Sequence, residues 1–117
     1  MQNRDAVVHQ VVGLIGGRWT LAVLSELQDE GRRYQELDEA LDGVSHKVLT
    51  ETLRRLERDG LVVRHIDPSR VDTATLYELT VLGRLLEEPL IVLGRWGQTN
   101  WSHVEAARRG WDRRRNV

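Results

Sequence analysis

Side chains that can bind a polyanion gather in one stretch of the chain, VSHKVLTETLRRLERDG, residues 44–60. It contains lysine, arginine, histidine and hydroxyl groups, which donate to phosphates and to base edges in nucleic-acid complexes. Leucines recur within it at spacings of three and four residues, so it is predicted to form an amphipathic helix whose basic side chains lie opposite the leucines. The residues predicted to contact DNA from this helix are Ser45, His46, Lys47, Thr50 and Arg54.

Residue types at both ends of this stretch predict where the helix, residues 45–59, begins and ends. Ser45 is a favourable N-cap, because its hydroxyl can accept a hydrogen bond from a backbone N–H two or three residues later. Gly60 occupies the position where a left-handed residue ends a helix, and Leu61 is then expected to pack back on Leu56.

Further charged residues surround this helix in the sequence. Arg32 and Arg33, at the start of a preceding short helix, are predicted to touch phosphate, and so is Arg70 at the tip of a hairpin, where solvent exposure is the alternative. Glu51 would repel phosphate, so it is predicted either to accept from a cytosine amino group or to pair with Arg55 along the helix, and the intrahelical pair is favoured. The last ten residues hold five arginines, which could form a DNA-backbone arm, although a soluble tail packed across a partner is the favoured interpretation.

The composition limits the class of protein. A chain of 117 residues supports one domain, and its net charge of −1 argues against indiscriminate binding to polyanions. It has no cysteine, which excludes thiolate catalysis and thiol sensing, and its four scattered histidines predict no metal site and no cofactor. No glycine loop, nucleophile elbow or supported acid pair indicates an enzyme. Without a signal peptide or a long apolar run, a cytoplasmic location away from the membrane is expected.

Periodicity and turn residues predict the other elements. Three short helices and then a hairpin are typical of a winged helix-turn-helix, so the fold class is mainly α with a small β-hairpin wing. Thr80 can cap the last helix, and Pro89 must either kink that helix or begin a new one. The predicted helices are 5–15, 18–28, 34–41, 45–59 and 81–101, with strands at 61–66 and 75–80 and helix-forming sequence in the tail.

Four blocks of the sequence, in order, resemble the HxlR family of bacterial winged helix-turn-helix regulators, relatives of MarR-type repressors. They are LIGGRWTLAVLSEL, RRYQELDEAL, VSHKVLTETLRRLERDGLVVR, and YELTVLGRLL followed by RWG, together spanning most of residues 14–101. In the second block Tyr34 takes the aromatic position. Many members carry a sensor cysteine before the first block and a proline before the second wing strand, and this chain has neither.

The resemblance implies a sequence-specific, DNA-binding transcriptional regulator, a homodimer on a two-fold-related operator near its own or a neighbouring gene. A repressor is favoured over an activator. Residues 18–80 would form the DNA-binding core, with 5–15 and 81–117 as dimerisation helices and tail, and the wide apolar face of 82–96 also indicates a partner. The alternative is a winged helix that binds only another protein, which the low net charge keeps open.

Tryptophans offer a second candidate site. Trp19, Trp96 and Trp101 lie on helices expected near the dimer interface, where core packing is the simpler explanation for them. The alternative is an apolar pocket for a small aromatic effector, because a regulator without a thiol needs another input. The sequence names neither the operator, the regulated genes nor the effector.

Overall fold

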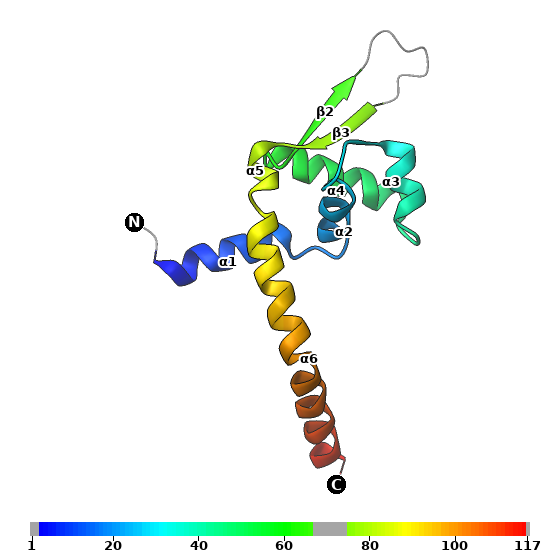
Figure 1. The fold of residues 1–117 in the computed structure, drawn as a ribbon. Helices are drawn as coiled ribbons and strands as arrows, with labels where there is room; N and C mark the ends of the chain where they lie inside the picture. Colours follow the sequence, from blue (N-terminus) through cyan, green and yellow to red (C-terminus); the bar gives the residue numbers. More distant parts are fainter. Residues whose placement is uncertain (1–2, 67–74, 117) are drawn as a thin grey trace. The chain divides into compact units, whose positions relative to one another are not determined.

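Four helices precede the hairpin in the computed structural model, which describes residues 3–66 and 75–116. Residues up to Arg84 form one compact unit, and those from Leu85 onward form a second. Figure 1 shows the helices and strands of both units. The four helices are α1 (Arg4–Ile15), α2 (Thr20–Glu26), α3 (Tyr34–Ala40) and α4 (His46–Arg58).

The sheet has one strand more than the sequence predicted. β2 (Val62–Ile66) and β3 (Thr75–Leu79) form the expected antiparallel hairpin, with Val62 opposite Leu79. A short strand β1 (Arg32–Arg33) pairs with the other edge of β3, so the strand order is β1-β3-β2. Arg32 and Arg33 lie immediately before α3, at the start of the helix predicted over 34–41, but the strand that they form was not predicted, because two residues are too few to show the alternation that marks a strand.

The predicted bounds of α4 are confirmed. The Ser45 hydroxyl accepts a hydrogen bond from the Val48 N–H at 3.1 Å. Gly60 has a φ of 77°, and the Leu61 N–H donates to the Leu56 carbonyl at 3.0 Å. This is the glycine-terminated arrangement that satisfies the last carbonyls of a helix.

The leucine face of α4 forms the centre of the core in the first unit. Leu49, Leu53 and Leu56 are at most 1% exposed. α4 packs against α2 and β2, while α3 closes the core through its buried Leu37. This burial leaves the opposite face of α4 as the one available for binding. The other fully buried large side chains are Val23, Leu24, Leu27, Leu61 and Val62.

Arg55 makes a different contact from the predicted one. Its guanidinium donates a hydrogen bond to the Thr20 hydroxyl at the start of α2, and Thr20 is fully buried. The ion pairs of the described residues include none between Arg55 and Glu51, so the favoured intrahelical pair is not formed. Gly17 leaves room for the guanidinium, since a Cβ at that position would lie 2.7 Å from Arg55 Nη2.

The C-terminal helix begins anew after a short helix α5 (Val81–Arg84). The Thr80 hydroxyl caps α5 by accepting from the Gly83 N–H at 3.0 Å, as predicted, and it donates to the Gly60 carbonyl at 2.6 Å. α6 runs over Glu87–Arg115, with Pro89 in its first turn, where a missing N–H breaks no helical hydrogen bond. Of the two outcomes predicted for Pro89, a kink or a new helix, the structure shows the new helix. The tail continues the same helix.

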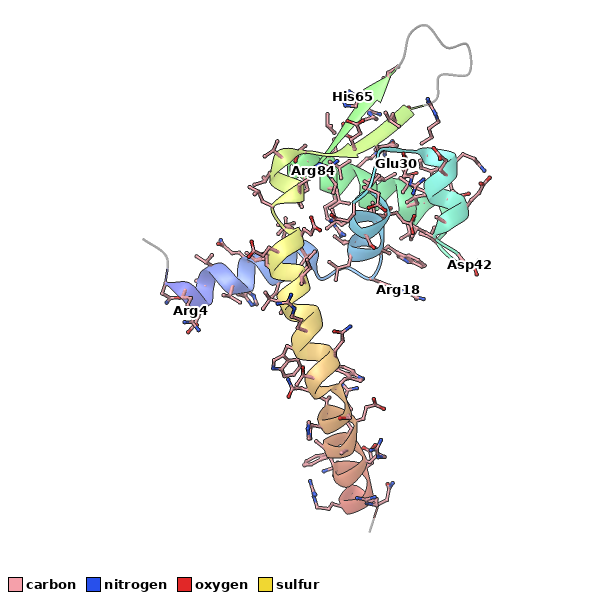
Figure 2. The ribbon with its side chains drawn as sticks, in the orientation of Figure 1. Arg4, Arg18, Glu30, Asp42, His65 and Arg84 are labelled. Atoms are coloured by element: carbon pink, nitrogen blue, oxygen red, sulfur yellow. The ribbon has the colours of Figure 1, made fainter. Side chains whose placement is uncertain are left out.

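Arg84, labelled in Figure 2, ends the first unit with a contact to the turn that follows α2, where its Nη1 donates to the Gln28 carbonyl at 3.1 Å. Within the described ranges, no single helix has the length and apolarity needed to cross a membrane. α1 and α2 pass that test only together, as a pair bent by 73° at the break between them.

Candidate nucleic-acid interface

The face of α4 opposite the core carries the predicted contact residues. Ser45, His46, Lys47 and Arg54 are exposed, whereas Thr50 is partly buried. The positive end of the α4 macrodipole lies at Ser45 and His46, which adds to the attraction for phosphate. The structure thus brings these five residues together on one helix, with buried leucines holding it from the other side.

Tyr34, the first residue of α3, is tied to the start of α4. Its hydroxyl lies 2.8 Å from His46 Nδ1, 3.2 Å from the His46 carbonyl oxygen and 3.1 Å from Thr50 Oγ1. The two rings meet edge to face, with centroids 5.1 Å apart. Two of the predicted DNA contacts are therefore held from α3. Sequence reasoning assigned Tyr34 no role at the site, although a tyrosine in an aromatic position has a hydroxyl that needs a partner.

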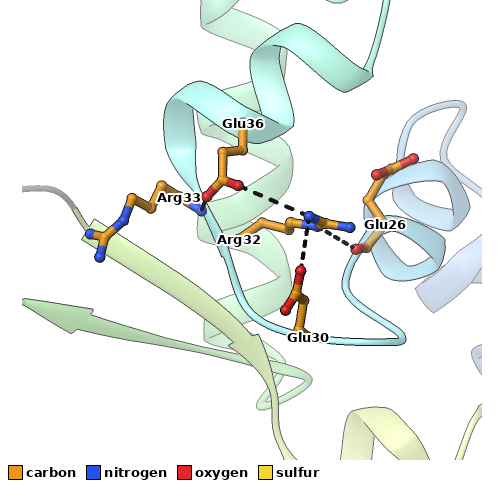
Figure 3. A network of polar contacts seen from close by, with 5 residues as sticks. All are labelled: Glu26, Glu30, Arg32, Arg33 and Glu36. Atoms are coloured by element: carbon orange, nitrogen blue, oxygen red, sulfur yellow. Dashed lines mark hydrogen bonds and ion pairs between the residues drawn. The ribbon is translucent and has the colours of Figure 1, made fainter.

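Arg32 is engaged by acidic groups and by backbone. Its guanidinium lies 3.2 Å from Glu30 Oε1 and 3.9 Å from Glu36 Oε2, and its Nε donates to the Glu26 carbonyl (Figure 3). The side chain is only 30% exposed. These contacts hold Arg32 at the junction of α2, β1 and α3, and the acids offset its charge, so a phosphate contact from Arg32 stays a prediction.

Arg33 follows Arg32 on β1 and precedes α3. Its backbone N–H donates to Glu36 Oε1 at 3.0 Å, so the carboxylate of α3 helps to begin that helix. In Figure 3 its guanidinium extends away from the side occupied by the Arg32 guanidinium, as alternation along a strand requires. A phosphate contact from Arg33 stays a prediction. Arg70, the predicted contact at the hairpin tip, lies outside the described residues.

The hairpin strands carry charged pairs on their exposed sides. Arg64 Nε lies 3.6 Å from Glu57 Oε1 of α4, and His65 Nε2 lies 3.3 Å from Glu78 Oε2 across the strand pair. Burial raises the pKa of the Tyr77 phenol, which lies opposite Arg64 on β3, and the charge of Arg64 opposes that rise. The Arg64–Glu57 pair joins the wing to α4, and the His65–Glu78 pair joins the two strands of the wing.

The three tryptophans of the second candidate site belong to different units. Trp19 is partly buried in the first unit, with the Arg18 guanidinium 5.1 Å from its ring centroid. Trp96 and Trp101 lie exposed on α6, where Arg108 covers the Trp101 ring at 5.2 Å. An open hollow on α6 is lined by other residues, so an aromatic pocket formed by these tryptophans stays a prediction. The lining residues are Val104, Ala107, Arg108, Trp111 and Asp112.

Comparison with known proteins assigns the family. The model of the HxlR-like helix-turn-helix family matches residues 14–105. The HTH-type transcriptional regulator YtcD of Bacillus subtilis is 35% identical over 97 residues, which are 83% of this chain and 76% of that protein. A further HTH-type transcriptional regulator, from Methanothermobacter thermautotrophicus, is 36% identical over 98 residues, 84% of this chain and 74% of that protein.

Solved structures agree with this assignment. A transcriptional regulator of the MarR family from Enterococcus faecalis superposes with a TM-score of 0.80 and 33% identity, covering 92% of this chain and 96% of that one. The redox regulator HypR in its reduced form gives a TM-score of 0.77 and 30% identity, covering 85% of this chain and 97% of that one. Together with the winged architecture and the exposed basic face of α4, these matches show that the chain belongs to the HxlR-like helix-turn-helix family of transcriptional regulators and is not an enzyme.

Proposed function

We propose that this regulator binds double-stranded DNA sequence-specifically, with α4 in the major groove, at a two-fold-related operator near its own or a neighbouring gene. The observation that carries the proposal is the division of α4 into two faces. Its leucines are buried to at most 1% exposure, while Ser45, His46, Lys47 and Arg54 face solvent. A helix held rigidly by its apolar face can present donors to base edges and phosphates.

The DNA-binding proposal predicts a steep salt dependence. A duplex selected by the protein from a random library is expected to bind far more tightly than a scrambled duplex. Both affinities should fall as salt rises, with a log–log slope of roughly −4 or steeper if a dimer neutralises four or more phosphates. Fluorescence anisotropy across a salt series measures this. Selection without a consensus, together with equal and weak binding to both duplexes, would instead support a module that binds only protein.

The regulator is proposed to act as a homodimer. Residues 18–80 would form its DNA-binding core, and residues 5–15 and 81–117 its dimerisation helices and tail. The support is apolar surface: no residue of α6 is buried. A large exposed apolar patch is rare on a monomer and marks an interaction site. A two-fold dimer would also place two copies of α4 against two half-sites. The exposed apolar residues of the two helices include Val7, Val8, Val11 and Val12 on α1 and Ile91, Val92, Leu93 and Trp96 on α6.

Leu93→Glu is expected to raise the dimer dissociation constant by about 100-fold or more, because it buries an unpaired charge in each copy of the interface. Leu93 is 61% exposed in the protomer, so the fold should survive the change. Sedimentation equilibrium measures the constant, and Gln98→Glu, which adds the same charge to α6, is the matched control. Equal dimerisation of both variants and the unchanged protein would place the interface elsewhere.

We further infer a repressor, because a dimer seated on an operator beside its target gene would block transcription. A cytoplasmic location follows from the same role. A small aromatic effector bound near Trp19, Trp96 and Trp101 stays a prediction.

A further inference from the structure

The Tyr34 hydroxyl joins three polar atoms of α4, and it has only one proton to give. The three atoms are His46 Nδ1 at 2.8 Å, the His46 carbonyl oxygen at 3.2 Å and Thr50 Oγ1 at 3.1 Å. A phenol donates one hydrogen bond and accepts two, whereas a carbonyl oxygen can only accept. If all three contacts are hydrogen bonds, the phenol proton therefore goes to the carbonyl of His46.

This allocation fixes the other two donors. Thr50 must donate its hydroxyl proton to the phenol oxygen, and His46 must donate from Nδ1–H. A neutral imidazole carries one proton, so its Nε2 is then an acceptor, and Nε2 becomes a donor only when the ring is charged. His46 is exposed, so Nε2 is the ring nitrogen left to face a ligand.

We propose that Tyr34 is a positioning residue of the DNA interface, which holds His46 as the Nδ1–H form and presents only Nε2 to the DNA. The inference rests on the proposed function of α4. It makes Tyr34 part of the specificity of the site, because the phenol decides which nitrogen of His46 is available and whether that nitrogen donates or accepts.

The arrangement limits which groups of the DNA His46 can bind. Phosphate oxygens and the exposed acceptors of guanine accept hydrogen bonds only. His46 held as the Nδ1–H form can donate to such an acceptor through Nε2 only as the imidazolium, whereas the neutral ring can accept through Nε2 from the amino group of adenine or cytosine. The titratable group that packs on the ring is Tyr34 from α3, and Lys47 follows His46 in the sequence.

Tyr34→Phe tests the inference, because it removes the hydroxyl and keeps the ring. Nitrogen-15 NMR of the imidazole at pH 8 is expected to show the Nδ1–H form of His46 in the unchanged protein and a shift to the common Nε2–H form in the variant. Tyr77→Phe, which removes the hydroxyl of the other tyrosine in the chain, should leave the signal unchanged. His46→Gln identifies which signal belongs to His46.

DNA affinity supplies the second readout, on the duplex selected by the unchanged protein. Its affinity should depend on pH between 8 and 5.5, rising towards low pH if Nε2 donates to phosphate or guanine and falling if Nε2 accepts from a base amino group. Tyr34→Phe should flatten this profile, because a neutral Nε2–H can donate without proton uptake. It should also weaken binding at pH 6 by about 3–10-fold, as expected for one lost hydrogen bond, with little change in melting temperature.

The outcomes separate this inference from the proposed function. An Nε2–H form in the unchanged protein, or identical pH profiles for the unchanged protein and Tyr34→Phe, would overturn the role of Tyr34 even if DNA binds tightly. The Nδ1–H form with no binding to any duplex would refute the DNA interface itself, and with it the role assigned to Tyr34 there.

Discussion

Replacing Lys47 and Arg54 together by alanine is expected to weaken binding to the selected duplex by roughly 100-fold or more. Both side chains lie on the exposed face of α4, within a span of eight residues. Loss of an arginine that reads a base costs about 1–3 kcal/mol, and loss of a lysine on phosphate lowers binding to all sequences. In a dimer each loss occurs twice. The preference of the protein for the selected duplex over a scrambled duplex should therefore shrink, while the fold is kept.

The matched control removes two charges elsewhere. Arg109→Ala with Arg113→Ala changes the net charge by the same amount on α6, in the arginine-rich tail. If the tail packs across a partner, this variant should bind the selected duplex within a few-fold of the unchanged protein. Equal losses in both double variants would contradict a special role for α4 and would identify the tail as a DNA-backbone arm. Anisotropy at fixed salt and pH compares all three proteins.

Gly83→Ala is expected to be the most destabilising single methyl addition in the first unit. A Cβ at Gly83 would lie 2.2 Å from the Leu61 carbonyl oxygen and 3.3 Å from Leu79 Cδ2. The carbonyl is backbone, and it already accepts from the Thr80 N–H at 3.0 Å, so neither group can move alone. Overpacking of this kind costs about 3 kcal/mol, which lowers the melting temperature by roughly 10 °C or more.

Gly110→Ala is the control for the glycine change. Its Cβ would meet only Arg114 Nη1, at 3.6 Å, which is ordinary contact with the end of a flexible side chain. Alanine stabilises a helix interior over glycine by about 0.5–1 kcal/mol, so this variant should melt at the same temperature or slightly higher. Thermal unfolding by circular dichroism measures both. A Gly83→Ala protein as stable as the control would mean that α5 does not pack on Leu61 as described.

The predictions that succeeded concern interactions between neighbours in the chain. The helix bounds at Ser45 and Gly60 follow from a hydroxyl and a backbone conformation that act within four residues, so local sequence is enough to place them. The leucine face of α4 follows from helical periodicity alone. Pro89 restricted its helix to two outcomes, and the new helix α6 begins two residues before it, so that Pro89 lies in the first turn.

The predictions that failed concern partners far apart in the chain. β1 is two residues long and exists only because β3 offers an unpaired edge. Arg55 was assigned to Glu51 on its own helix, yet its guanidinium reaches Thr20, 35 positions earlier, because α2 and α4 pack together.

The sequence by itself therefore determined the family, the order of the helices and hairpin strands, and the face of α4 that carries the basic and hydroxyl side chains. Each of these depends on residue type and on spacing within a few turns. Only the tertiary structure decided that Tyr34 holds His46 and Thr50 from another helix. Contacts between residues that are far apart in the chain leave no periodic pattern in the sequence. The chemistry of such contacts therefore becomes visible only once the chain is folded.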